Sequence, residues 1–289
     1  MTVRAEIENR ACTVDAMGKS RIRRPWLFTI LLASAVCLAY LLAAMVHWGE
    51  AADRSLYANL GMIPIGLAAT LLATEAAGSR HDRRSSWAWW LLAAGFGCFW
   101  AGDVLYFVYQ NVFGSPPFPS PADAGYLAYY PLVFIGLLCF PRRLAHHLSR
   151  RVTYPSCLIL VGGGAAAILV LFLLPTLQSS RDDLFLYCLS VGYPFGDLLL
   201  LGGIAWMLLR GAWANQWSIW LLSMGLLIGL AADVLFGYQS IQGSFLSGGL
   251  PDVAYMLSWA AFAWAGYAEM ARKHQPVTRG PRVGETVES

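Results

Sequence analysis

The chain has 289 residues, of which 57% are hydrophobic and only 13% charged, and its formal net charge is +3. Soluble globular domains carry about a quarter charged residues. This composition therefore excludes an ordinary water-soluble protein and predicts an all-α, polytopic membrane protein. The small cationic excess is explained by membrane topology, so we expect no nucleic-acid partner.

Eight stretches are long and apolar enough to form transmembrane helices, because a helix needs roughly 20 mostly apolar residues to cross the hydrocarbon core. Residues 1–24 form a basic segment before a membrane domain at 25–270, and the polar tail 271–289 is expected to be disordered. In chain order the predicted spans are 25–48, 57–77, 87–110, 123–141, 155–175, 183–208, 216–238 and 251–270.

The distribution of Lys and Arg predicts the orientation of these spans. With a cytoplasmic N-terminus, only Arg54 and Arg181 fall on the outer side, which leaves 18 of the 20 Lys and Arg on the inner side. This asymmetry follows the positive-inside rule. We expect a multi-pass protein of a bacterial inner (plasma) membrane, embedded in the lipid bilayer, with both termini in the cytoplasm.

Two segments 130 residues apart are similar in sequence. "WAWWLLAAGFGCFWAGDVL" (87–105) aligns without a gap on "WSIWLLSMGLLIGLAADVL" (217–235). The matching tryptophans and aspartates carry most of the weight, because leucines and alanines match in any pair of membrane helices. The alignment pairs Asp103 with Asp233.

The similarity continues into the following segments. With one residue deleted, "PADAGYL" (121–127) aligns on "LPDVAYM" (250–256). We infer two four-helix repeats, at about 25–141 and 155–270, which have the same orientation in the membrane because four is an even number of spans. The second alignment pairs Asp123 with Asp252 and Tyr126 with Tyr255.

Five aspartates are expected toward the outer half of the membrane domain, with no Lys or Arg inside any span to neutralise them. Counted at about 1.5 Å per residue, Asp103 lies roughly 24 Å into a core about 30 Å thick. An ionised aspartate near the centre costs about 2.5 to 3.5 kcal/mol, so these groups should face the interior and be protonated, hydrogen-bonded or paired with a cation. The predicted pocket comprises Asp103, Asp123, Tyr126, Tyr193, Asp197, Asp233, Asp252 and Tyr255.

Each aspartate also has a purely structural interpretation. Asp123 and Asp252 follow proline-containing turns, where an acidic residue caps a helix N-terminus. Asp103 and Asp233 can hydrogen-bond between helices. Asp197 follows a Pro-Phe-Gly sequence, where its carboxyl can occupy backbone groups freed by a kink or a broken helix. Further candidate partners of the carboxyls are Tyr106, Tyr109, Tyr129, Tyr130, Tyr238 and His47.

The sequence excludes several catalytic chemistries. A zinc hydrolase needs several His or Cys at one depth, but of the five histidines only His47 is near a span, so no metal site is predicted. There is no GxSxG nucleophile elbow and no phosphate-binding glycine loop between a strand and a helix. The six cysteines lack CxxC spacing and predict free thiols. Acid–base chemistry by paired carboxyls stays open.

The strings "WAGDVLYFVYQ", "FPSPADAGYLAYYPLVFIGLL", "GYPFGDLLLL" and "LPDVAYMLSWA" resemble the multi-span membrane input region that precedes GGDEF, EAL or histidine-kinase domains in bacterial signalling proteins. The likeness covers most of residues 60–270 and implies a sensing or structural pocket. Because no such output domain follows in residues 271–289, we expect the chain either to act through a signalling partner or to have a function of its own. The positions that the resemblance marks are Asp103, Asp123, Tyr126, Pro194, Asp197, Asp233 and Asp252.

A weaker resemblance is to lysoplasmalogenase-type membrane hydrolases, which also have about eight spans, an early GD and a later aspartate. We expect a sensory or ligand-binding module whose acidic, tyrosine-lined pocket opens to the outside between the third, fourth, sixth, seventh and eighth spans. The alternatives are an intramembrane lysophospholipid hydrolase and a proton- or cation-coupled transporter. The sequence does not identify the small ligand or cation, or any cofactor.

Overall fold

The computed structural model describes residues 27–32, 34–40, 51–79, 82–114, 119–141, 150–170, 174, 184–210, 216–245 and 248–272. Regular structure in these residues is entirely helical, which confirms the all-α prediction. The helices are α2 (Ala51–Gly78), α3 (Arg83–Phe107), its π-helical continuation η1 (Val108–Val112), α4 (Ala122–Cys139), α5 (Arg150–Ile168), α7 (Leu184–Leu209), α8 (Trp217–Ile241) and α9 (Leu250–Arg272).

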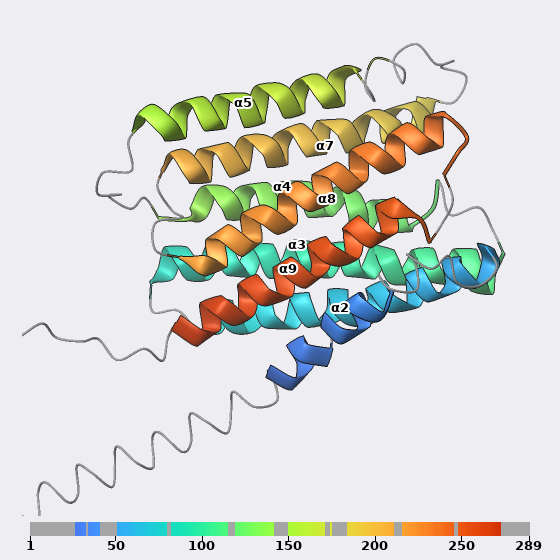
Figure 1. The fold of residues 1–289 in the computed structure, drawn as a ribbon, viewed down its shortest axis with the longest axis horizontal. Helices are drawn as coiled ribbons and strands as arrows, with labels where there is room; N and C mark the ends of the chain where they lie inside the picture. The colour runs from blue at the N-terminus through green and yellow to red at the C-terminus, as the bar shows by residue number, and fades with distance from the viewer. Residues whose placement is uncertain are drawn as a thin grey trace, which may run out of the picture.

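The helices lie side by side along the long axis of the molecule, and successive helices run in opposite directions (Figure 1). Two antiparallel pairs form the centre: α3 packs along α4, and α8 packs along α9. The helix α2 joins them, since it packs against both α3 and α9. On the other side, α7 packs against α4 and, more lightly, α8, and α5 packs on α7.

Five of the described helices are long and apolar enough to cross a membrane, which marks a membrane-embedded protein. They correspond to the second, third, fourth, sixth and seventh predicted spans. The fifth predicted span contains only a shorter apolar stretch, Cys157–Ile168, and α9, which has two Trp, two Tyr and the acidic Asp252 and Glu269, is not among the five. The eight-span topology therefore stays a prediction. The five segments are Leu56–Gly78, Arg83–Val112, Ala122–Cys139, Tyr187–Leu209 and Trp217–Ser240.

Some predictions concern residues outside the described ones. These include the basic segment 1–24, most of the tail 271–289, and the side chains of His47, Arg54 and Arg181. Of the first predicted span, residues 27–32 and 34–40 are described and helical. The described cysteines are free thiols, as predicted; they are Cys37, Cys98, Cys139, Cys157 and Cys188.

Large apolar side chains cover the outside of the bundle. Trp87 and Trp217, which the sequence alignment pairs, are both exposed, and so are Leu158 and Ile159 on the outer helix α5. A soluble monomer rarely exposes apolar surface on this scale. In a bilayer the same side chains contact lipid, so the free-energy cost of exposing apolar surface to water does not arise.

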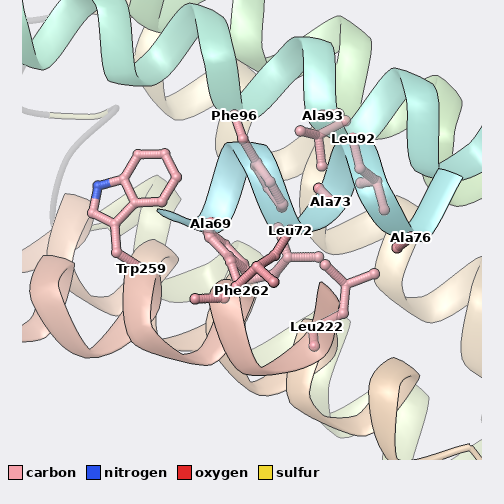
Figure 2. Close-up of a cluster of buried hydrophobic side chains, with 14 of the residues drawn as sticks. Ala69, Leu72, Ala73, Ala76, Leu92, Ala93, Phe96, Leu222, Trp259 and Phe262 are labelled. Atoms are coloured by element: carbon pink, nitrogen blue, oxygen red, sulfur yellow. The ribbon is translucent and has the colours of Figure 1, made fainter. Parts of the chain in front are cut away.

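The helix α9 is held close to α2 by small residues. A Cβ atom on Gly266 would lie 2.8 Å from the carbonyl carbon of Leu72, so only glycine permits this approach. Beside the contact, the rings of Phe96 on α3 and Phe262 on α9 stack with centroids 4.4 Å apart. Figure 2 shows these side chains with the alanines of α2 and with Trp259. This packing fixes the face of α9 that carries the polar residues described next.

Candidate functional site

Asp103, on α3, has a hydrogen-bond donor for each carboxyl oxygen. The Tyr126 hydroxyl of α4 donates to Oδ1 at 3.1 Å, and the indole N–H of Trp259 on α9 donates to Oδ2 at 3.3 Å. The Tyr126 ring lies on Gly102, where a Cβ atom would be 2.7 Å from the ring. Glycine therefore brings the hydroxyl next to the carboxyl, and three helices meet at one aspartate.

Asp233 lies at the matching position on α8. The Tyr255 hydroxyl of α9 donates to its Oδ1 at 2.6 Å. The two bonds join consecutive helices over nearly the same separation, 23 residues for Tyr126 and Asp103 and 22 residues for Tyr255 and Asp233. The second partner differs, because Asp233 faces the carboxyl of Asp197 on α7.

Asp197 is the most buried of the five aspartates, with 3% of its surface exposed. Its Oδ1 has no hydrogen-bond partner among the described residues. Its carboxyl lies against that of Asp233, and the Tyr130 hydroxyl faces both. The Tyr130 ring covers Gly196, where a Cβ atom would clash with it. The site is thus tightly packed around a carboxyl oxygen that lacks a donor.

The helix around Asp197 is not broken. α7 continues as one helix through Pro194 to Leu209. Because Oδ1 of Asp197 accepts no hydrogen bond, this oxygen does not occupy a backbone N–H freed by the proline. Hydrogen bonding to the backbone near Pro194 therefore does not explain why this oxygen is buried.

Asp123 and Asp252 lie in the first turns of α4 and α9, where each accepts a backbone N–H from just before its helix, as the acidic residue of a capping box does. Asp123 Oδ2 accepts from the backbone N–H of Ser120 at 2.7 Å, and Asp252 Oδ2 accepts from that of Gly248 at 2.6 Å. Capping is not the whole role of Asp123, because its Oδ1 also accepts a hydrogen bond from the Tyr193 hydroxyl of α7. Both caps lie at the end of the bundle where α4 and α9 begin.

Within the described residues, the donors that reach the five aspartates are tyrosine hydroxyls, an indole N–H and backbone N–H groups, none of which carries a charge. Arg210 is at the opposite end of α7, where its Nη1 donates to the Leu138 carbonyl at 3.3 Å. Two ionised carboxylates in contact repel strongly in an apolar interior. Asp197 and Asp233 therefore need a proton or a bound cation between them.

Some of the predicted partners do not reach a carboxyl. Tyr238 is exposed, and the Tyr109 ring packs edge-on against Phe113 at 5.7 Å. Tyr129 differs from these two: it is buried, its ring is 5.4 Å from that of Tyr130, and it lies near Asp233 and Asp197. His47 lies outside the described residues. The eight residues of the predicted pocket all lie on α3, α4, α7, α8 and α9.

Sequence reasoning missed two polar groups. Trp259 lies four residues after Tyr255, so it shares a helix face with it, and this spacing was the available signal. Glu269 is 1% exposed, at the opposite end of the bundle, where its Oε2 accepts from the Ser218 hydroxyl at 2.5 Å. Its signal was an acidic residue inside the eighth predicted span.

The described residues contain no group of three or more His, Cys, Asp or Glu side chains arranged to hold a metal ion. What the site offers chemically is a pair of carboxyls from two helices, surrounded by tyrosine hydroxyls. We find no match to this chain among family models, curated proteins or solved structures.

Proposed function

We propose that this chain is a ligand-binding module of the sensory type in a bacterial inner membrane, with Asp197 and Asp233 at the centre of its binding site and with a partner protein as its output. The observation that carries the proposal is the Asp197 carboxyl, which is buried, has one oxygen without a donor and lies against a second carboxyl. A buried polar group in this state is costly unless something binds there.

The proposed architecture is eight spans in two parallel four-helix repeats. It is supported by matching contacts in the two halves. A tyrosine of α4 donates to an aspartate of α3, and a tyrosine of α9 donates to an aspartate of α8. Each of these tyrosine-bearing helices also begins with an aspartate that accepts a backbone N–H of the preceding turn.

Occupancy of the site controls how α7 packs. Asp197 is on α7 and Asp233 is on α8, and these two helices share far fewer contacts than α8 and α9 do. Two ionised carboxylates push α7 away from α8, whereas a bound cation or proton removes the repulsion and joins the helices. A ligand that binds one of two packing states shifts the equilibrium toward it, which is the change that a partner detects.

Thermal unfolding of the purified chain in detergent tests this function. The probes are protons, alkali and alkaline-earth chlorides, and small primary and quaternary amines. We expect at least one of them to raise the Tm of the wild type and of Asp103→Asn, the matched control, and to have no effect on Asp197→Asn. An equal response of all three proteins contradicts the proposed site.

Two other measurements separate this function from the alternatives. Ion flux in proteoliposomes that depends on Asp197 would support a transporter. Release of product from a lysophospholipid would support a hydrolase. The sensory module predicts neither activity.

A further inference from the structure

We infer that the ligand of the Asp197–Asp233 pair is a single proton, held on Asp197 and donated to the Asp233 carboxylate. This inference rests on the binding site of the proposed function and names its ligand. It is drawn from a comparison of Asp103 and Asp233, which align in sequence but have different second partners.

The first half shows what a complete carboxylate site requires. Asp103 accepts from the Tyr126 hydroxyl and from the Trp259 indole N–H, so each oxygen has a donor. Asp233 accepts from the Tyr255 hydroxyl in the same way. Where Asp103 has an indole, however, Asp233 has the carboxyl of Asp197. A carboxyl can donate a hydrogen bond only when it is protonated.

The proton belongs on Asp197. Asp233 already receives the O–H of Tyr255, which stabilises its ionised form. Asp197 is more deeply buried, and its Oδ1 has no donor. Uptake of one proton from water converts the Asp197 carboxylate to the acid, and its new O–H donates to the Asp233 carboxylate. The charge of the pair changes from minus two to minus one.

In the part of the chain that the structure describes, the titratable groups that face the pair from each neighbouring helix are tyrosine hydroxyls. They are Tyr129 and Tyr130 from α4, Tyr193 from α7 itself and Tyr255 from α9. Hydroxyls stay neutral and cannot balance a second negative charge. A calcium ion takes six to eight oxygen ligands and a magnesium ion six, which is more than two carboxyls supply without further ligands. A proton needs no additional ligand.

The second carboxyl belongs to only one half. The 130-residue shift that aligns Asp103 with Asp233 places Leu67 of α2 opposite Asp197. Leu67 is 38% exposed on the outside of the bundle, whereas Asp197 is 3% exposed. The two halves therefore differ in function: one aspartate is permanently satisfied, and the other depends on proton uptake.

Infrared spectroscopy of the full chain in lipid nanodiscs tests the inference. At neutral pH the wild type should show the carbonyl stretching band of a protonated carboxylic acid, shifted in D₂O. We expect Asp197→Asn to lose this band and the control Asp103→Asn to keep it. The asparagine amide donates to Asp233 as the acid does, so Asp197→Asn should fold. Replacing sodium by choline in the buffer should leave the band unchanged.

Three results would overturn the inference: a wild-type spectrum without such a band, a band that persists in Asp197→Asn, or a band that sodium removes. The first of these results needs no variant, so the inference can be overturned even if a variant fails to fold. The outcome is also separable from the proposed function. A Tm response that needs Asp197 but no protonated acid rejects the proton and keeps the binding site, whereas the band without any Asp197-dependent response keeps the proton and rejects the sensory function.

Discussion

Asp103 and Asp233 occupy matching positions on α3 and α8, yet different helices complete their surroundings. At Asp103 the second donor comes from α9, as the Trp259 indole. At Asp233 the second partner comes from α7, as the Asp197 carboxyl. The same local sequence therefore produces a satisfied carboxylate in one half and a pair of carboxyls in the other.

The difference arises from the helix that packs against each pair. α2 packs closely on α3 and α9, with its alanines in the apolar cluster of Figure 2 and with Gly266 of α9 against its Leu72, and the residue of α2 that aligns with Asp197 is Leu67. α7, its counterpart under the 130-residue shift, contributes Asp197 and Tyr193. The two helix pairs thus make the same tyrosine–aspartate hydrogen bond, while one flanking helix changes the chemistry around it.

Gly196→Ala, which displaces the Tyr130 ring, should have the largest effect on the free energy of unfolding. The new Cβ atom would clash with the Tyr130 ring, and overpacking of this kind costs about 1 to 3 kcal/mol. Gly202→Ala is the control on the same helix, because its Cβ atom meets nothing within 4 Å. It should stabilise the helix by about 0.5 to 1 kcal/mol. Unfolding in mixed micelles measures both, and equal effects of the two variants would contradict the described seating of Tyr130.

Removal of the carboxyl that starts α4 and removal of the one that starts α9 should lower the free energy of unfolding by different, smaller amounts. Loss of a capping side chain costs about 0.5 to 2 kcal/mol. Asp123→Ala should cost more than Asp252→Ala, because Asp123 also accepts from the Tyr193 hydroxyl of α7. The same unfolding assay applies, with Tyr193→Phe as a second background. In that background the two alanine variants should become equivalent, and a gap that persists there would mean that the tyrosine bond does not stabilise α7.

The two tyrosine–aspartate hydrogen bonds should each contribute a smaller, nearly equal amount to the free energy of unfolding. Hydrogen bonds between membrane helices average about 0.6 kcal/mol. Tyr126→Phe and Tyr255→Phe should each lower the free energy of unfolding by about this amount, since each removes one hydroxyl donor from an equivalent aspartate. Double variants with Asp103→Asn and Asp233→Asn isolate the pair energies. A loss in only one half would show that the two bonds are not equivalent.

Hydropathy predicted α3, α4, α7 and α8 to within a few residues, because long apolar runs dominate the signal, but it placed the start of α2 at residue 57 where the helix begins at Ala51. It placed the start of α3 at residue 87, whereas the helix begins at Arg83. The first turn is polar, and Asp82 caps it by accepting from the backbone N–H of Ser85 at 3.2 Å. A hydropathy window does not detect such a polar turn, so the accuracy of the predicted helix ends is limited to several residues.

The site was predictable where contacts lie within one helix pair and unpredictable where they join two pairs. The sequence alignment pairs Tyr126 with Tyr255 and Asp103 with Asp233, so it placed both tyrosines and both aspartates in the predicted pocket without naming which tyrosine reaches which carboxyl. The approach of Trp259 to Asp103 depends on α9 packing beside α3, and the contact of Asp197 with Asp233 depends on α7 packing beside α8. Neither neighbour relation is encoded in the periodicity of a single helix.

Trp259→Phe should have the clearest effect on the difference between Asp103 and Asp197. Phenylalanine keeps most of the packing against Phe96 and Phe262 but removes the indole N–H that completes Asp103. Asp103 then resembles Asp197, with an oxygen that lacks a donor. We expect a second protonated-carboxyl infrared band, which Asp103→Asn in the same background removes. An unchanged spectrum would mean that the missing donor is not what distinguishes the two aspartates, and the contact between Asp197 and Asp233 would then carry the difference alone.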